Sequence, residues 1–253
     1  RYIVGSFQGE ATFDNVTLQA FGKDAFVTCR EANGSVRWAK RFGGLDQVEA
    51  TDVTVSSDGS VYVTGSFRGV SEFDGVVHIA AGHSDGFLLK LDTNGTVQWV
   101  RSIGGENEDR GNGVTVAADG SVRWIGHFGE SASMEGESLT SSGGKDMFIA
   151  KLSPAGSVDW AESAGGSNED SGNAVVTNGE GLTYVAGIVN HGNLNDSFLL
   201  QYDSNGVPQW GEKISGALNN QVLDLAADAS GVYLAGSFEG VTTFGDVTTT
   251  SKG

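Results

Sequence analysis

Short apolar runs alternate with glycine-containing turns along the whole chain, which predicts β-strands rather than helices. In the best-defined stretch, apolar runs at 112–117 and 122–128 flank a turn at 118–121, and two more runs follow at 146–152 and 157–163. The Asn-Gly and Asp-Gly pairs in such turns supply the positive-φ positions that tight hairpins need. The pattern therefore predicts four antiparallel strands in this stretch.

The same pattern recurs along the chain. Tryptophans follow the related segments EANGSVRW, DTNGTVQW, SPAGSVDW and DSNGVPQW at spacings of 61, 61 and 50 residues, and a segment like VYVTGSF occurs five times. A fixed period of this size takes priority over any local pattern, because each repeat is one structural unit that stacks on its neighbours. The units expected are 1–60, 61–121, 122–181, 182–231 and a partial unit at 232–253.

An insert that reads as a small hairpin lies between the second and third strands, at 12–18, 72–79 and 134–140, and the fourth unit lacks it. Four antiparallel strands at this period are typical of a β-propeller blade. We therefore expect an all-β fold, a β-propeller of tandem four-stranded antiparallel blades of about 60 residues, with four full repeats plus a partial fifth. The second strand occurs once more than the others, which indicates an excerpt of a longer array or self-association that completes the ring.

Residues 61–109 contain, in order, a Val-Tyr-Val-x-Gly strand, Asp-x-Phe, Lys-Leu-Asp, Asn-Gly, Trp, Gly-Gly and an acidic loop, and the other units keep variants of this order. This order resembles the SBBP-type bacterial β-propeller repeat over nearly the whole chain. The resemblance weakens in the shortened fourth unit and in SPAG at 153–156. It implies a secreted or cell-surface bacterial protein, and it brings no catalytic motif.

Charge and composition narrow the function further. With 15 Lys and Arg against 32 Asp and Glu, the net charge of −17 repels nucleic-acid phosphates and anionic membrane surfaces. Thirty-nine glycines interrupt the chain too often for a membrane-spanning helix, so neither nucleic-acid binding nor membrane insertion is expected. The single cysteine, Cys29, cannot form an internal disulfide, and the chain contains no P-loop or nucleophile elbow.

Positions that differ between units are better functional candidates than positions that all units share. The repeated tryptophans and the aspartates of Asp-x-Phe are therefore expected to be architectural. The loops after Gly-Gly are acidic, with Asp46 and Glu49 in the first unit and GGENEDRGNG in the second. Clustered carboxylates suit calcium, so Glu106, Glu108 and Asp109 are weak metal candidates; the alternative is a solvated acidic rim, because the spacing lacks an EF-hand ladder.

Strand parity places the inserts and the acidic loops on one rim and the short, similar turns on the other. Variable loops on a rigid scaffold are where binding sites are built. The candidate ligand contacts on this rim are His78, His83, Glu106, Glu108, Asp109, Arg110, Glu169 and Asp170. His127 is also noted, because it stands where three other units have serine.

Two functions remain open. The first is an extracellular or cell-surface, non-enzymatic scaffold or recognition module for a protein or glycan partner. The alternative is a glycoside hydrolase or lyase that uses a carboxylate pair on the loop-rich rim. No catalytic residue is assigned, and no cofactor is expected apart from possible calcium.

Overall fold

The computed structural model describes residues 1–192 and 194–252, and these residues form 21 strands and no helix. The all-β prediction is therefore confirmed, and no segment in the described ranges is a helix that could span a membrane. Gly253, the last residue of the partial fifth unit, lies outside the described residues.

The strands form five successive antiparallel groups, each called a sheet below, and two short hairpins; with the hydrogen bonds through the inserts included, these groups and hairpins make up four sheets. The first sheet contains β1 (Tyr2–Phe13), β2 (Val16–Arg30) and β3 (Val36–Gly44). The second contains β4 (Val48–Val55), β5 (Val61–Phe67), β8 (Asp85–Leu91) and β9 (Val97–Gly105). The third contains β10 (Arg110–Val116), β11 (Val122–Met134), β12 (Glu137–Leu152) and β13 (Val158–Ala164). The fourth contains β14 (Asp170–Thr177), β15 (Thr183–Asn190), β16 (Asn195–Tyr202) and β17 (Pro208–Gly216), and the fifth contains β18 (Asn220–Asp228) and β19 (Gly231–Phe238). The short hairpins are β6 (Val70–Phe73) with β7 (Val76–Ile79), and β20 (Val241–Phe244) with β21 (Val247–Thr250).

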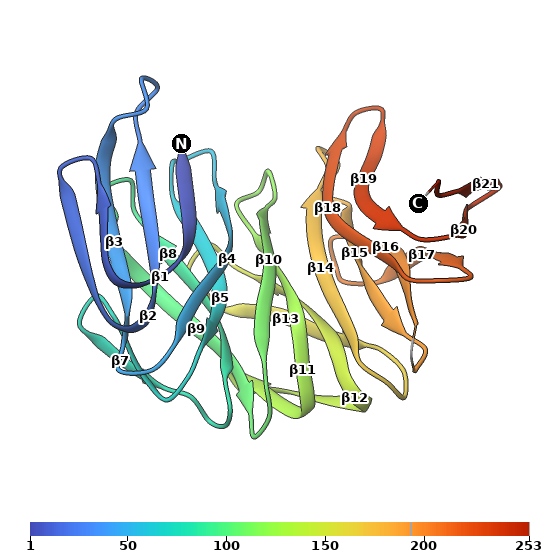
Figure 1. Cartoon of the computed structure of the whole chain (residues 1–253), viewed down its shortest axis with the longest axis horizontal. Helices are drawn as coiled ribbons and strands as arrows, with labels where there is room; N and C mark the ends of the chain where they lie inside the picture. The colour runs from blue at the N-terminus through green and yellow to red at the C-terminus, as the bar shows by residue number, and fades with distance from the viewer. Residues whose placement is uncertain (193, 253) are drawn as a thin grey trace.

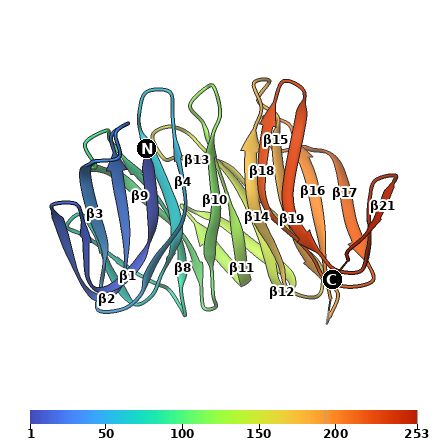
Figure 2. The same ribbon diagram turned by 45° about the horizontal axis from the view of Figure 1, so that its top comes forward.

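The sheets stand one after another in an open arc (Figures 1 and 2). The first strands of successive sheets, β4, β10, β14 and β18, are neighbours along this arc, and β1 lies beside β4. The first sheet lies at one end of the arc and β19 to β21 at the other, so the described residues do not close into a ring. The repeated antiparallel sheets agree with the prediction, whereas the closed propeller remains a proposal.

The core lies between the sheets, which explains the continuous apolar runs in their third strands. In β8, Phe87 and Leu89 pack toward the first sheet, and Leu88 between them packs toward the third sheet with Trp124. A strand buried on both faces needs no alternation of polar and apolar residues. Fully burying side chains of this size contributes about 1.5–3 kcal/mol each to folding.

The repeated tryptophans occupy equivalent positions, as predicted. Each lies opposite an equivalent residue of the preceding strand, just before a shift in strand register, in the pairs Trp38–Cys29, Trp99–Lys90, Trp160–Lys151 and Trp210–Gln201. The indole nitrogens of Trp38 and Trp99 donate to the backbone oxygens of Thr93 and Pro154 at 3.0 and 3.2 Å. Because these oxygens belong to turns of the next sheet, Trp38 and Trp99 join successive sheets.

The inserts cross from one sheet to the previous one. Those of the second, third and fifth units pair with the end of the preceding sheet's fourth strand, in the pairs Gly43–Glu72 and Gly44–Ser71, Gly104–Ser133 and Gly105–Ala132, and Ser215–Thr243 and Gly216–Thr242. The fourth unit has no insert, and β13 ends at Ala164, whereas β3, β9 and β17 continue through the two paired residues.

Candidate functional site

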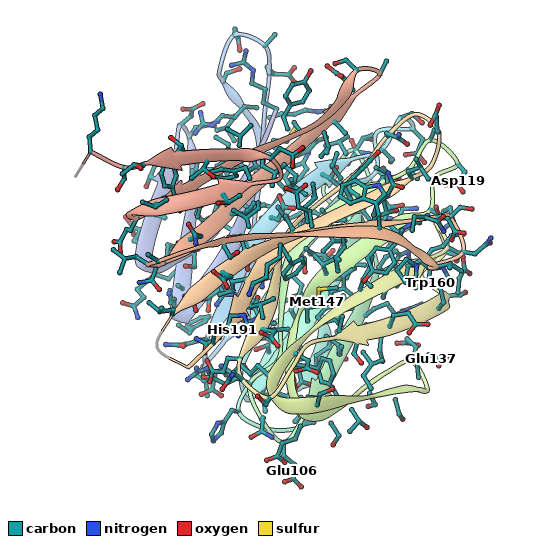
Figure 3. All side chains as sticks on the ribbon, turned by 90° about the vertical axis from the view of Figure 1, so that its right-hand side faces the viewer. Glu106, Asp119, Glu137, Met147, Trp160 and His191 are labelled. Carbon is teal, nitrogen blue, oxygen red and sulfur yellow. The ribbon has the colours of Figure 1, made fainter. Side chains whose placement is uncertain are left out.

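The acidic loops and the insert hairpins lie at the same end of the sheets, as strand parity predicted. The hairpins pair with the residues that open these loops, and parallel bridges join Lys23 to Gln47 and Ser84 to Glu108. Glu106 at this end and Asp119 at the opposite end are well separated in Figure 3. The variable segments therefore share one rim.

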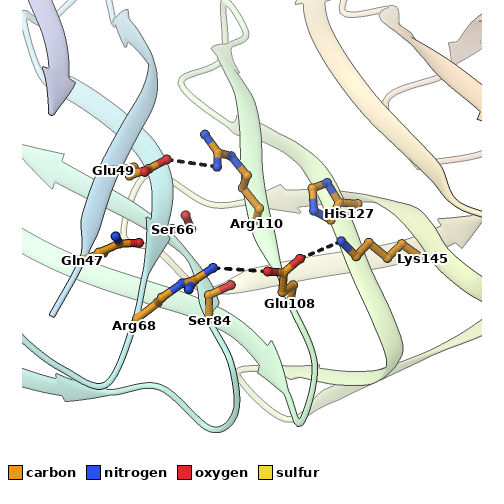
Figure 4. A pocket seen from close by; sticks show the side chains of 9 residues that line it. All are labelled: Gln47, Glu49, Ser66, Arg68, Ser84, Glu108, Arg110, His127 and Lys145. Atoms are coloured by element: carbon orange, nitrogen blue, oxygen red, sulfur yellow. Dashed lines mark hydrogen bonds and ion pairs between the residues drawn. The ribbon is translucent and has the colours of Figure 1, made fainter. Parts of the chain in front are cut away.

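A polar cavity of 260 Å³ opens at this rim between the second and third sheets (Figure 4). We call it the basic cavity. Most of its side chains come from the inner strands β4 and β10, from the ends of β5 and β11, and from the segments next to them. Its lining residues are Gln47, Glu49, Ser66, Arg68, Ser84, Glu108, Arg110, His127 and Lys145.

Two carboxylates in the basic cavity are held by cations from different sheets. Glu108 accepts from Arg68 at 3.2 Å and from Lys145 at 2.8 Å. Glu49 accepts from Arg110 at 3.2 Å and also pairs with Lys23. Three of these cations, Arg68, Arg110 and Lys145, line the cavity with the two carboxylates, so its ionised side chains carry a net charge of +1 in a chain whose total charge is −17.

Both carboxylates stay ionised. The hydrogen bond from Lys23 holds the pKa of Glu49 below its ordinary value, and Arg110 adds to the effect. The hydrogen bond and charge of Lys145 lower the pKa of Glu108 in the same way. Because Arg68 remains half exposed, its free N–H groups can still bind an anion that enters the cavity.

His127 reaches the cavity from β11 and is neutral at pH 7. Burial, together with the nearby charges of Lys145 and Arg110, lowers its pKa to about 4. Its Nδ1 lies 3.4 Å from the Asn112 amide nitrogen and 3.3 Å from the Ser171 hydroxyl.

The structure separates the eight candidate contacts into groups. Glu108 and Arg110 line the basic cavity. His83 and Glu169 line a neighbouring hollow of 380 Å³, which Glu108 and Lys145 share. These four residues therefore lie around one region of the rim.

Asp109 and Asp170 are buried and hold the backbone instead of facing solvent. Asp109 accepts from the N–H groups of Gly105 at 2.7 Å and Gly129 at 3.0 Å. Asp170 accepts equivalently from Gly166 at 2.5 Å and Asn190 at 3.0 Å. Each carboxylate thus fixes the loop that enters an inner strand to the end of the next strand, which is an architectural role.

The remaining candidates lie away from the cavity. The ring of His78, on β7, packs against Phe73 with 5.4 Å between ring centroids, and Glu106 is exposed. Of the calcium candidates, Glu108 is ion-paired and Asp109 is buried, and no group of three metal-binding side chains gathers among the described residues. Calcium binding stays a prediction.

Sequence reasoning missed Lys23, Arg68 and Lys145, and it treated Glu49 only as part of an acidic loop. A signal was present, because the position of Glu49 is Arg110 in the next unit and Ser171 in the following one. Comparing each strand position between units, rather than only the loops, would have found the Glu49–Arg110 pair.

The comparisons with known proteins are sparse. No family model matches the chain. Over 228 residues the chain is 28% identical to the regulatory protein FlaEY of Caulobacter vibrioides. This alignment covers 78% of the chain but 24% of FlaEY, so the chain spans about a quarter of that relative.

Proposed function

We propose that this chain is a non-enzymatic recognition module that binds a carboxylate-bearing ligand, part of a protein or an acidic glycan, in the basic cavity. One observation carries the proposal: side chains that break the repeat pattern converge from several strands on one cavity with excess positive charge. Arginine and lysine on a rigid scaffold recognise carboxylates by charge-assisted hydrogen bonds.

The alternative of a glycoside hydrolase or lyase has less support. Glu49 and Glu108 do face one cavity, as a carboxylate pair must. A general acid, however, needs a raised pKa, and the pKa values of both groups are lowered by cations. Binding is therefore the better use of this charge arrangement.

The wider setting is part of the same proposal. The antiparallel four-stranded sheets and the resemblance of the repeats favour a β-propeller of an extracellular or cell-surface bacterial protein. A second copy of the chain could complete the open arc by self-association.

The test is an NMR titration of the ¹⁵N-labelled chain at low ionic strength with N-acetylglutamate and, separately, with glucuronate. We expect signals of the basic cavity to shift, and the more effective probe distinguishes a protein from a glycan source. Arg68→Gln should weaken binding about tenfold, because a hydrogen bond between charged groups is worth about 1.5–3 kcal/mol.

Arg37→Gln is the matched control, since Arg37 is an exposed arginine that pairs with Glu31 instead of the cavity carboxylates. It should leave the affinity within twofold. Absence of any shift with both probes, or equal weakening by the two variants, would show that the basic cavity is not a carboxylate site.

A further inference from the structure

We propose that the edge formed by residues 163–166 at the end of β13 binds one extended segment of a partner protein by β-strand addition. The segment has a small side chain, then any residue, then Phe or Met, then Lys or Arg. Strand addition uses backbone hydrogen bonds for affinity and alternate side chains for specificity. This site is separate from the basic cavity.

Three equivalent edges in the same chain are already filled, and they show what this position accepts. The ends of β3, β9 and β17 each pair with a hairpin strand through two residues. The paired strands are 70–73, 131–134 and 241–244, all supplied by the insert of the following unit. β13 has no such partner among the described residues.

Gly166 is a glycine, as are the equivalent residues at the three filled edges. A Cβ atom placed on the equivalent Gly44, Gly105 or Gly216 would lie 2.5, 1.9 or 2.5 Å from a hairpin carbonyl oxygen. These glycines are required by the close approach of the hairpin backbone. A Cβ on Gly166 would have only Asp170 Oδ2 nearby, at 3.6 Å among the described atoms. Nothing described at this edge therefore requires a glycine.

The hydrogen bonds that hold the backbone around the empty edge match those at a filled edge. Asp170 holds Gly166 and Asn190 as Asp109 holds Gly105 and Gly129 at the filled edge. Beyond Asn190 the chain turns back at once, with the His191 N–H donating to the Leu194 oxygen at 2.8 Å. The His191 ring lies 3.1 Å from the Lys213 amine and is thus directed toward β17.

The filled edges define the side chains of the segment. At the first paired position stand the buried Ser71, Ala132 and Thr242, and two residues later stand Phe73, Met134 and Phe244. Phe73 packs on Phe42 and Phe67, with ring centroids 5.9 Å apart in both pairs. The equivalent positions at the empty edge are Ala164 and Val189, two smaller and half-buried residues that leave space for the large side chain.

The last position of the segment is set by charge. In two filled junctions, the residue two after the tryptophan pairs with the hairpin turn, Lys40 with Asp74 at 3.8 Å and Arg101 with Glu135 at 3.6 Å. The equivalent residue of β13 is Glu162, which is exposed. In the third filled junction the equivalent residue is Glu212, which faces Gly245 of the hairpin turn, so this position accepts a turn residue without charge. Opposite charge favours Lys or Arg at this place in the incoming segment.

The test uses a cyclised peptide of residues 69–80 that carries Asp74→Lys, because a free hairpin is marginally stable in water. Titrated into the ¹⁵N-labelled chain, it should shift the amide signals of Gly165 and Gly166. Gly166→Ala should abolish binding without lowering the melting temperature, since the added methyl has room in the unbound chain. Gly179→Ala, at an open turn position, is the matched control and should bind normally.

Reversing the charge of Glu162 tests the charge expected at the last position of the segment. Glu162→Lys should weaken binding of the Asp74→Lys peptide at least fivefold and strengthen binding of the unmodified peptide. No shift up to millimolar peptide, or equal binding by Gly166→Ala, would overturn the proposal. Shifts of the same amides on raising the protein concentration alone would assign the edge to a second copy and overturn the choice of occupant.

Discussion

Residue identity is constrained differently at the two ends of the sheets. At the turn end, Trp38 and Trp99 make the same contact with the next sheet, because each ring is held between two sheets. At the loop end, one strand position holds Glu49, Arg110 and Ser171 in successive units, and Glu49 and Arg110 face the basic cavity instead of a packed neighbour. Packing between sheets fixes residue identity at one end, and its absence leaves the other end free to acquire a binding site.

The largest expected effect tests the packing end. Trp99→Ala should destabilise the chain by about 3 kcal/mol, since it removes a large ring and its hydrogen bond between two sheets. Trp210→Ala should cost less than about 1 kcal/mol, because this tryptophan is 42% exposed. Urea denaturation measures both values. Equal costs would mean that the contact between sheets does not stabilise the arc.

The second effect compares the stability cost of changing a buried and an exposed acidic residue of one loop. Asp109→Ala should cost about 2 kcal/mol, because the N–H groups of Gly105 and Gly129 lose their acceptor. Asp109→Asn should cost less, as it keeps one acceptor, and Glu106→Ala should stay within about 0.5 kcal/mol. Thermal unfolding of the three variants makes the comparison, and a costly Glu106→Ala would contradict it.

The pH dependence of stability contrasts buried aspartates with His127. Burial raises the pKa values of Asp85 and Asp109 to about 6, so the folded chain holds protons that the unfolded chain releases between about pH 4 and 6. Their contribution to the free energy of unfolding therefore falls as pH rises through this range. His127 acts oppositely: with a folded pKa of about 4 and an unfolded value of about 6.5, it destabilises the fold as pH drops between them.

His127→Gln should therefore change how the free energy of unfolding depends on pH. Between pH 6.5 and 4, the free energy of unfolding of this variant should rise on acidification relative to wild type, by up to about 1.4 kcal/mol per pH unit. Urea denaturation at a series of pH values measures both curves, and parallel curves would show that His127 does not remain neutral in the fold.

The smallest effect concerns calcium at the loop end. If the loops bind it weakly, calcium at a concentration equal to the dissociation constant stabilises the chain by only about 0.4 kcal/mol. The melting temperature should then rise slightly at millimolar calcium and not with magnesium chloride of equal ionic strength. A flat response up to millimolar calcium would remove the metal prediction.

The strand pattern was predictable to within a few residues, except at the inserts. The expected strands at 122–128 and 146–152 are the cores of β11 and β12, which continue to Met134 and begin at Glu137. Past a register shift between Gly129 and Ser131, the same two strands pair again and form the insert hairpin. Local pattern could not show this, because whether a strand bends or continues depends on its neighbour in the previous sheet.

The sequence by itself determined the strands, the repeat and the equivalent tryptophans, because turn chemistry and apolar periodicity are local properties. Only the tertiary structure decided the roles of three acidic residues that lie within four positions. Glu106 is in solvent, Glu108 is ion-paired in the basic cavity, and Asp109 is buried against backbone N–H groups. The cations that hold Glu108, Arg68 and Lys145, lie 40 and 37 residues away in the sequence, and burial and Coulomb energy depend on such neighbours in space.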